Sequence, residues 1–259
     1  MSAYTRRALC ASPTQPAQAA AVELAEGEDW VDMADADIVI ALGGDGFMLQ
    51  TLHAMLERRR PDVPVFGMNL GTVGFLMNEW RRDGLGERLA QAKPFKVTPL
   101  AATLRSKDGR VHQLPAINEV SLLRETRQTA KLEVAVNERV VIDELACDGI
   151  LVATPAGSTA YNLSAHGPIL PLGSALLALT PISPFRPRRW RGAILPDKAR
   201  IALRVLEPAK RPVSAVADHR EIRDIASVEI AVDRSRELTL LFDPEHALDD
   251  RITMEQFIA

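Results

Sequence analysis

Ile38-Val39-Ile40-Ala41-Leu42-Gly43-Gly44-Asp45-Gly46 is the stretch that decides the expected fold of the first part of this chain. Its first five residues are apolar, partly β-branched and about as many as a strand needs, which indicates a buried parallel strand. After the glycines, apolar residues recur at the spacing of one helix face, at Met48, Leu49, Leu52, Met55 and Leu56. The glycines therefore lie at a strand-to-helix turn, where backbone N–H groups and the helix N-terminus favour an anion such as phosphate.

Asp45 within this turn has two explanations. A carboxylate beside bound phosphate is repulsive unless it serves a metal or a proton transfer, so one explanation is catalytic. The other is that Asp45 only caps the following helix, a position where Asp is common. The short Gly-Gly-Asp-Gly motif does not decide between them.

Composition and length restrict the class of protein. The 259 residues suffice for one large domain or two smaller ones, and 47% hydrophobic and 25% charged residues are ordinary for a soluble globular protein. A net charge of −3 gives no general attraction to nucleic acid or to anionic membranes, so we expect neither as a partner. The two cysteines and five histidines show no disulfide or metal-ligand spacing, and no segment reads as a signal peptide or membrane span. We expect a cytoplasmic protein without a structural metal.

The first part of the chain has the alternation of an α/β domain. Residues 7–12 are typical of a strand, residues 16–24 of an alanine-rich helix, and Val65-Phe66-Gly67-Met68-Asn69 of the next strand after the glycine turn. A second glycine-rich turn, residues 69–76, follows that strand. Two such turns after successive parallel strands are expected side by side at the carboxyl edge of the sheet, where open α/β folds bind ligands.

From Phe95 onward the pattern changes to short β segments, which predicts an all-β domain. We therefore expect an α/β domain over residues 1–94 with a parallel sheet, a β-rich domain over 95–243, and a C-terminal segment, 244–259, packing back on the first domain. The predicted strands of the β region cover residues 97–104, 116–123, 132–136, 140–145, 150–153, 200–206, 213–217, 228–232 and 238–242.

Three stretches of the β region have chemical character. Asn118-Glu119 interrupts an apolar run, and it is either a strand pair with one residue facing solvent or a pair that recognises hydroxyls or a base edge. Residues 148–164 combine small and hydroxylated residues with Tyr161, a composition that suits close ligand approach and base stacking but also ordinary loops. Residues 185–191 hold four arginines and Trp190, and they form either a phosphate site or a solvated or subunit-contacting loop.

Taken together, these motifs resemble the bacterial NAD kinase family. The resemblance rests on residues 43–46, 69–76, 118–119, 148–149, 154–161 and 164–169, which occur in the order of the family and extend from about Asp37 to Pro171. Gly-Gly-Asp-Gly alone is also similar to phosphofructokinases and lipid kinases. The Thr-Pro-Ala-Gly-Ser-Thr-Ala-Tyr stretch separates the family from these.

The resemblance implies transfer of the γ-phosphoryl group of ATP, or of polyphosphate, to the 2′-hydroxyl of the adenosine ribose of NAD. It implies that Asp45 is the catalytic base, that a divalent cation, Mg²⁺, arrives with ATP, and that the protein is a homodimer or homotetramer. It assigns Asp148 to the nicotinamide half of NAD across a subunit contact. The remaining implied substrate-binding residues are Gly46, Phe75, Asn118, Glu119, Ala156, Thr159, Ala160, Tyr161, Asn162, Leu163 and Ser164.

Alternatives from other classes remain at this point. A lipid or sugar kinase sharing the Gly-Gly-Asp-Gly turn would phosphorylate a different hydroxyl, and a non-catalytic NADP-binding protein would not turn over. Ala146, His166 and the Asp218-His219-Arg220 run depart from the usual family pattern, at positions expected to touch the dinucleotide phosphates.

Overall fold

The computed structural model describes residues 4–26, 29–71 and 74–245, and the chain divides into two compact units. Unit 1 comprises residues 1–97 and 235–259, and unit 2 comprises residues 98–234. Unit 1 combines a sheet with helices and unit 2 is built from antiparallel sheets, so the expected fold class is confirmed. Among the described residues, no helix has both the length and the apolar character needed to cross a membrane.

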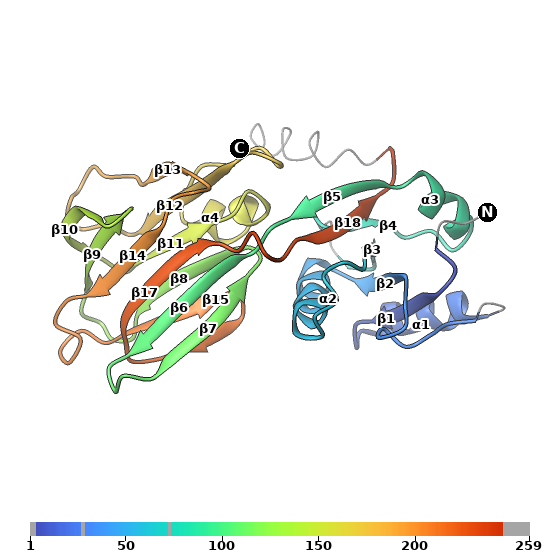
Figure 1. Cartoon of the computed structure of the whole chain (residues 1–259), viewed down its shortest axis with the longest axis horizontal. Helices are drawn as coiled ribbons and strands as arrows, with labels where there is room; N and C mark the ends of the chain where they lie inside the picture. Colours follow the sequence, from blue (N-terminus) through green and yellow to red (C-terminus); the bar gives the residue numbers. More distant parts are fainter. Residues whose placement is uncertain (1–3, 27–28, 72–73, 246–259) are drawn as a thin grey trace. The chain divides into compact units, whose positions relative to one another are not determined.

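The described residues of unit 1 form one six-stranded sheet and three helices (Figure 1). The strand order is β1-β2-β3-β18-β5 with β4 beside β3, and every neighbouring pair is parallel except β18 and β5. The strands are β1 (Arg7–Ala11), β2 (Ile38–Gly43), β3 (Val65–Asn69), β4 (Asn78–Glu79), β5 (Lys93–Val97) and β18 (Leu238–Phe242). The helices are α1 (Gln15–Ala25), α2 (Asp45–Glu57) and α3 (Leu85–Gln91).

The pleat of β2 and β3 divides the helices between two faces of the sheet. Alternate residues Ile38, Ile40 and Leu42 join Phe66 and Met68 in one core cluster with residues of α1 and α3. Gly67 faces the other way, since a Cβ atom there would lie 2.3 Å from the Met48 side chain of α2. The apolar stripe predicted for α2 is thus buried on the face opposite α1 and α3, with Met48, Leu52, Met55 and Leu56 at 5% exposure or less.

The expectation that Leu238–Phe242 belongs to the β-rich domain is wrong. This segment is β18, which pairs in parallel with β3 through Leu240 and Val65 and antiparallel with β5 (Figure 1). The boundaries between the units fall at Val97 and Ser235, where the sequence suggested 94 and 243. A buried strand of a largely parallel sheet and a core strand of a sandwich have the same apolar pattern, so the sequence does not specify the sheet. Residues 246–259, most of the predicted C-terminal segment, lie outside the described residues.

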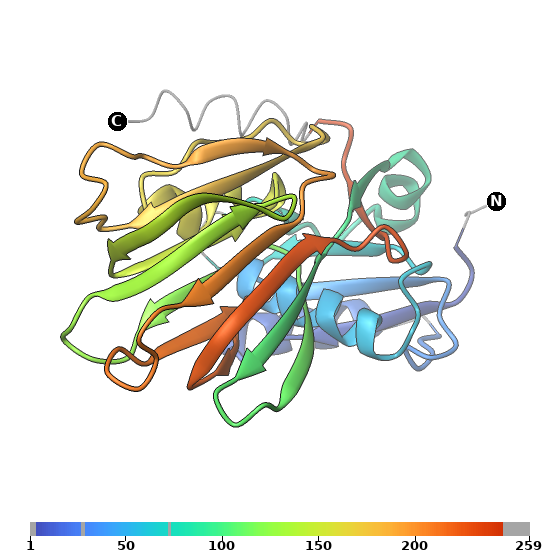
Figure 2. The same ribbon diagram turned by 60° about the vertical axis from the view of Figure 1, so that its left-hand side comes forward.

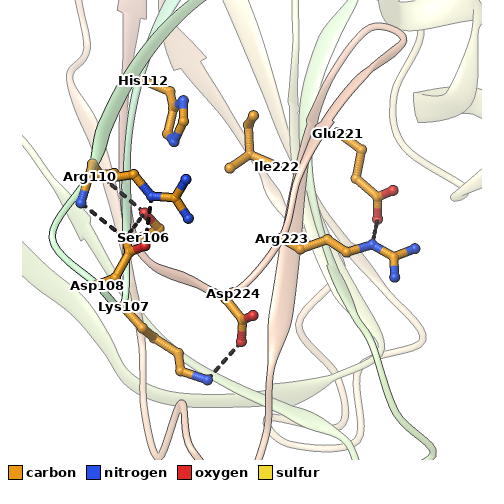
Figure 3. Close-up of a pocket in the computed structure, with 9 residues that line it drawn as sticks. All are labelled: Ser106, Lys107, Asp108, Arg110, His112, Glu221, Ile222, Arg223 and Asp224. Atoms are coloured by element: carbon orange, nitrogen blue, oxygen red, sulfur yellow. Dashed lines mark hydrogen bonds and ion pairs between the residues drawn. The ribbon is translucent and has the colours of Figure 1, made fainter.

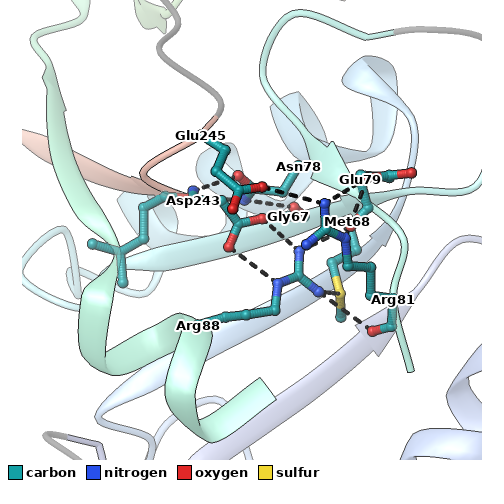
Figure 4. Close-up of polar contacts among 9 residues, drawn as sticks. Gly67, Met68, Asn78, Glu79, Arg81, Arg88, Asp243 and Glu245 are labelled. Carbon is teal, nitrogen blue, oxygen red and sulfur yellow. Dashed lines mark hydrogen bonds and ion pairs between the residues drawn. The ribbon is translucent and has the colours of Figure 1, made fainter. Parts of the chain in front are cut away.

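A buried polar network holds the end of β18 in unit 1 (Figure 4). The Asp243 carboxylate accepts two hydrogen bonds from the Arg88 guanidinium, at 2.6 and 3.0 Å, and both side chains are at most 10% exposed. The Asn78 side chain donates to Leu241 O at 2.9 Å and accepts from Asp243 N at 2.8 Å. Arg88 also lies over the Phe66 ring. Removing one partner of such a pair leaves an unpaired buried charge, which is strongly destabilising.

Unit 2 consists of two six-stranded antiparallel sheets that enclose one apolar core (Figures 1 and 2). Their strand orders are β10-β9-β14-β17-β6-β7 and β13-β12-β11-β8-β15-β16. The first sheet contains β6 (Leu100–Ser106), β7 (Val111–Ala116), β9 (Ala130–Val136), β10 (Arg139–Cys147), β14 (Ile201–Val205) and β17 (Ile225–Val232). The second contains β8 (Glu119–Arg124), β11 (Gly149–Ala153), β12 (Leu176–Ile182), β13 (Ala193–Pro196), β15 (Val213–Ala217) and β16 (Arg220–Ile222). Two short helical turns, η1 (Ala156–Thr159) and α4 (Tyr161–Ser164), follow β11.

Candidate functional site

The two glycine-rich turns of unit 1 lie side by side. Gly43 ends β2, and its carbonyl oxygen accepts a hydrogen bond of 2.7 Å from Leu70 N at the start of the second turn. Asn69 closes that turn locally, because its side-chain oxygen accepts from Gly71 N at 3.2 Å. The expected meeting of both turns at the carboxyl edge of the sheet is therefore confirmed, while Thr72 and Val73 lie outside the described residues.

Asp45 links the first turn to the second. It is the first residue of α2, and its carboxylate accepts hydrogen bonds from Phe75 N at 2.7 Å and from Leu76 N at 3.0 Å. A Cβ atom on Gly74 would lie 2.4 Å from Asp45 Oδ1, so only glycine permits this approach. The helix is preceded by Gly44 and has no side-chain cap. The carboxylate is thus oriented by the second turn.

Open space adjoins this carboxylate at Gly46. Gly46 is exposed, and a Cβ atom built on it would meet no atom within 4 Å. The hydrogen-bond ladder of α2 begins with Phe47 and Met48, which both donate to Gly44 O at 3.0 Å. The N–H groups before them belong to the orphan donors of a helix N-terminus and suit an anionic group.

In unit 2, Asn118 and Glu119 lie where β7 gives way to β8. Glu119 is only 8% exposed, and its Oε2 atom has no hydrogen-bond partner in the described part of the chain. Asn118 Oδ1 is likewise buried without a partner there. Buried acceptors without partners are costly, so two of them side by side suit a ligand that donates hydrogen bonds.

Burial changes the acid–base behaviour of Glu119. Desolvation, with a smaller effect from the negative charge of Asp218, raises the pKa of the Glu119 carboxyl from 4.5 to about 8. The free protein therefore holds Glu119 mostly protonated at neutral pH. A ligand that donates hydrogen bonds favours the ionised carboxylate, which is the stronger acceptor.

The loop after β11 is held by its own buried side chains. Ser158 Oγ donates to Pro155 O at 2.7 Å and accepts from Leu170 N at 3.0 Å. The Asn162 amide donates to Ser158 O and Pro168 O, at 3.0 and 2.8 Å, and its oxygen accepts from Thr180 Oγ1 at 2.7 Å. Because Asn162 is fully buried and bonded on both ends, its side chain fixes the loop and is not available to a ligand.

Tyr161 presents a half-buried ring at the end of this loop. It packs against a cluster that includes Leu151 and Leu170. Burial raises the pKa of its phenol, with smaller effects from the negative charges of Glu119 and Asp148. The Asp148 carboxylate is itself ion-paired with Arg124 at 2.6 Å. The Tyr161 phenol thus lies within electrostatic reach of both Glu119 and Asp148.

The other predicted site residues are also located. Ala156, Thr159, Ala160 and Leu163 are half-buried on the same loop, and Ser164 is exposed at its end. Gly46 and Phe75 accompany Asp45 in unit 1. Thr154 and Asp218 are not among the predicted site residues, yet both bond to the backbone around Asn118. The only signal for Asp218 in the sequence is that the Asp218-His219-Arg220 run departs from the family pattern.

A hollow of about 440 Å³ in unit 2 is lined by none of the predicted site residues (Figure 3). It lies between the turn after β6 and the turn after β16. Its cations are already paired with carboxylates: Lys107 with Asp224, Arg110 with Asp108, and Arg223 with Glu221, at 2.6 to 3.3 Å. In the described residues no group of three or more His, Cys, Asp or Glu is arranged to hold a metal ion.

Comparisons with known proteins agree on one family. Residues 10–93 match the model of the ATP-NAD kinase N-terminal domain, and residues 117–243 match that of the ATP-NAD kinase C-terminal domain. An NAD kinase of Rhizorhabdus wittichii is 67% identical over 252 residues, covering 97% of this chain and 98% of that protein. An NAD kinase of Zymomonas mobilis is 63% identical over 254 residues, covering 98% of each.

Solved structures share the fold at lower identity. An NAD kinase from Archaeoglobus fulgidus in complex with ATP has a TM-score of 0.75 and 20% identity, covering 98% of this chain and 100% of that chain. Yeast NADH kinase complexed with NADH has a TM-score of 0.74 and 24% identity, covering 86% of this chain and 66% of that chain.

Proposed function

The chain belongs to the NAD kinase family, and we propose that it transfers the γ-phosphoryl group of ATP, or the terminal group of polyphosphate, to the 2′-hydroxyl of the adenosine ribose of NAD. The product is NADP, and the enzyme is a phosphotransferase with an alcohol as acceptor. The observation that carries the proposal is the Asp45 carboxylate, which Phe75 N and Leu76 N hold beside the glycine turn.

Asp45 retains the capacity to accept a proton from a substrate. A carboxylate offers about four acceptor positions, and the two backbone N–H groups use two of them. A substrate hydroxyl donates to a third, and Asp45 takes its proton as the oxygen bonds to the γ-phosphorus. The bond from that phosphorus to the bridging oxygen breaks, and ADP leaves with the electron pair. Phosphoryl transfer needs positioning and charge neutralisation above all, so one oriented carboxylate beside a phosphate cradle is sufficient protein chemistry.

In this proposal Mg²⁺ would arrive bound to ATP, and it would supply neutralisation of the phosphate charge. The glycine-turn N–H groups of this chain bind the phosphates, and Asp45 orients the acceptor hydroxyl.

Unit 2 supplies the proposed recognition of the adenosine half of NAD. Asn118 Oδ1 and Glu119 Oε2, which have no hydrogen-bond partner among the residues that the structure describes, accept hydrogen bonds from the dinucleotide. The half-buried Tyr161 ring stacks on the base, and Ala156, Thr159, Ala160, Leu163 and Ser164 line the approach. The backbone of Asn162 contributes in the same loop, while its side chain keeps the loop in place.

Self-association through unit 2 is the proposed quaternary arrangement. An apolar hollow of about 450 Å³ lies between the edge strands β10 and β13, lined by Val141, Trp190 and Leu195 among others. Val141 and Ile194 are 52% and 53% exposed. Edge strands with exposed apolar residues favour association, and a second copy of the chain covers them in the proposed homodimer or homotetramer. Asp148 serves the nicotinamide half of NAD across that contact.

The Asp45→Asn variant tests the catalytic role. Asparagine keeps the size of the side chain but removes the proton acceptor, so kcat should fall by about 10²–10⁴ while the KM for NAD changes little. Asparagine also turns an N–H donor toward Phe75 N or Leu76 N, which costs about 1–3 kcal/mol of stability.

Asp37→Asn provides a matched control for that cost. Asp37 is also in unit 1 and accepts a hydrogen bond from the backbone of Arg6, at 3.3 Å, besides its ion pair with the Arg6 side chain. It lies outside the glycine turns, so this variant should lose stability without losing turnover. NADP formation from NAD, ATP and Mg²⁺ is measured for both. A kcat for Asp45→Asn within about threefold of the parent would remove Asp45 as the base.

A further inference from the structure

Asp218 binds three consecutive backbone N–H groups in the segment that carries Asn118 and Glu119. Its carboxylate accepts from Ile117 N at 2.7 Å, from Asn118 N at 2.9 Å and from Glu119 N at 3.2 Å. In return, Asp218 N donates to Glu119 O at 3.1 Å. One side chain, about 100 residues away in the sequence, thus fixes the whole donor side of this segment.

Thr154 holds the acceptor side of the same segment. Its hydroxyl donates to Ile117 O at 2.8 Å, and its backbone N donates to Asn118 O at 2.9 Å. Every backbone N–H and C=O from 117 to 119 therefore has a partner. In contrast, the side-chain atoms Asn118 Oδ1 and Glu119 Oε2 are buried without partners in the described part of the chain. The backbone of this segment is thus fully hydrogen-bonded, while these two side-chain oxygens remain available to accept hydrogen bonds from a ligand.

The backbone of Asp218 is adapted to this position. It lies in the turn between β15 and β16 with φ at +54°, in the left-handed region that Asp and Asn tolerate better than most residues. Since β15 pairs with β8 through Ala217 and Val120, the turn is adjacent to the start of β8. The sheet register therefore brings the carboxylate to the three N–H groups.

We propose that Asp218 is a positioning residue for the dinucleotide: by clamping the backbone of residues 117–119, it aims Asn118 Oδ1 and the Glu119 carboxyl at the bound ligand. The identity of the ligand as NAD rests on the proposed function. The clamp itself is independent of it.

The charge of Asp218 has a second, separable effect. Glu119 interacts electrostatically with Asp218 from the β15–β16 turn and with the Tyr161 phenol from α4. After burial, the negative charge of Asp218 is the second cause that raises the pKa of Glu119. If the ligand selects the ionised Glu119, the KM for NAD falls as the pH rises toward about 8. Removing the charge of Asp218 moves that midpoint to lower pH.

Two variants and one control separate these effects. Asp218→Asn keeps the shape and tolerates the left-handed backbone, but its amide cannot accept all three hydrogen bonds. Asp218→Gly removes the side chain and adopts a positive φ without strain, so it protects the test against misfolding. Asp224→Asn is the control, because Asp224 is another left-handed Asp of unit 2, with φ at +55°, that is exposed and paired with Lys107.

The readouts are steady-state kinetics from pH 6 to 9 and hydrogen exchange of the amides of residues 117–119. Both Asp218 variants should raise the KM for NAD roughly 10- to 100-fold with kcat within about threefold of the parent, and should speed exchange of the three amides. Their KM midpoint should move to lower pH. Asp224→Asn should match the parent in every readout.

The outcomes distinguish this inference from the proposed function. Faster amide exchange with an unchanged KM and pH profile would make Asp218 merely structural and overturn the inference. Slow exchange in both variants would overturn it as well. If the parent makes no NADP, the proposed function fails, and calorimetric binding of NAD and NADP to the same variants then decides on Asp218: parental affinity in both variants overturns the inference, and weakened affinity supports it.

Discussion

Replacing Glu119 by glutamine should remove the loss of stability that the buried Glu119 carboxyl causes in the parent as the pH rises. Glutamine has nearly the same shape as glutamate but carries no titratable proton. In the parent, burial holds the folded-state pKa of Glu119 at about 8, whereas an exposed glutamate titrates near 4.5. Below pH 4.5 the carboxyl is protonated in both states, so ionisation contributes nothing to the difference between parent and variant.

Between pH 4.5 and about 8 the unfolded chain loses this proton while the folded chain keeps it. The folded state then binds more protons, so the free energy of unfolding falls as the pH rises. Each pH unit is worth about 1.4 kcal/mol, which gives a total loss on the order of 5 kcal/mol by pH 8 as an upper limit. Structural relaxation around the ionised group reduces this figure. The unfolding free energy of Glu119→Gln minus that of the parent should therefore increase by several kcal/mol from pH 5 to pH 8.

Urea unfolding of both proteins at pH 5, 6, 7 and 8 measures this difference. Trp190 packs against the core of unit 2 and reports its unfolding when Trp30 and Trp80 of unit 1 are replaced by phenylalanine. Glu133→Gln serves as a control, since the hydrogen bond from Arg204 lowers the pKa of Glu133 below its usual 4.5. Glu133 is then ionised in both the folded and the unfolded state from pH 5 to 8, so the difference in stability between the parent and Glu133→Gln should stay constant over this range. Identical pH dependence in the parent and Glu119→Gln would refute the reasoning.

Three further predictions concern the proposed stacking of Tyr161 on the base, the buried Arg88–Asp243 pair at the end of β18, and the apolar hollow between β10 and β13. Tyr161→Ala should raise the KM for NAD by the 1–3 kcal/mol of a base–aromatic stack, roughly 5- to 150-fold, while Tyr161→Phe keeps the parental KM; equal KM values in a folded Ala variant would exclude stacking. Arg88→Met should cost about 3–5 kcal/mol of unfolding free energy because Asp243 is left charged and buried, whereas Arg81→Met, at an exposed pair, should leave the unfolding free energy nearly unchanged. Val141→Asp should shift the sedimentation of the protein toward a smaller species, and a parent that is fully active as a monomer would contradict the proposed self-association.

The sequence predicted the structure correctly where the signals for an element and for the turn next to it lie in one continuous stretch. The strand, glycine turn and helix predicted over residues 38–56 follow from period and turn chemistry, and the structure reproduces them as β2 and α2, with α2 ending at Glu57. The strand Val213–Ala217 also has the predicted bounds. The strand Leu238–Phe242 has them too, but it lies in the other sheet. A pattern of alternation specifies which residues are buried and leaves open which strand they pair with.

Side-chain contacts over long sequence separations were the part that the sequence did not predict. Asp45 was recognised as unusual, yet its bonds to Phe75 N and Leu76 N could not be read from spacing, and neither explanation of the residue included them. Asp218 contributes through bonds to a segment 99 to 101 residues away. Such contacts depend on strand order and register, which a single sequence leaves undetermined.

In unit 2, hydrogen bonding distinguishes side chains that hold the loop after β11 in place from Glu119, the side chain proposed to bind the ligand. Thr154, Ser158 and Asn162 are fully buried or nearly so, and their polar groups are bonded inside the unit, so truncating them should loosen the loop. Glu119 is also buried, at 8% exposure, but its Oε2 atom has no partner within the described ranges of the chain. A protein selected for stability alone would place an apolar side chain at position 119, because a buried acid without a partner lowers the free energy of unfolding at neutral pH. In the proposed function, hydroxyl groups of the bound dinucleotide restore that lost stabilisation, so the cost at Glu119 in the free protein supports the proposed role of this side chain in recognition.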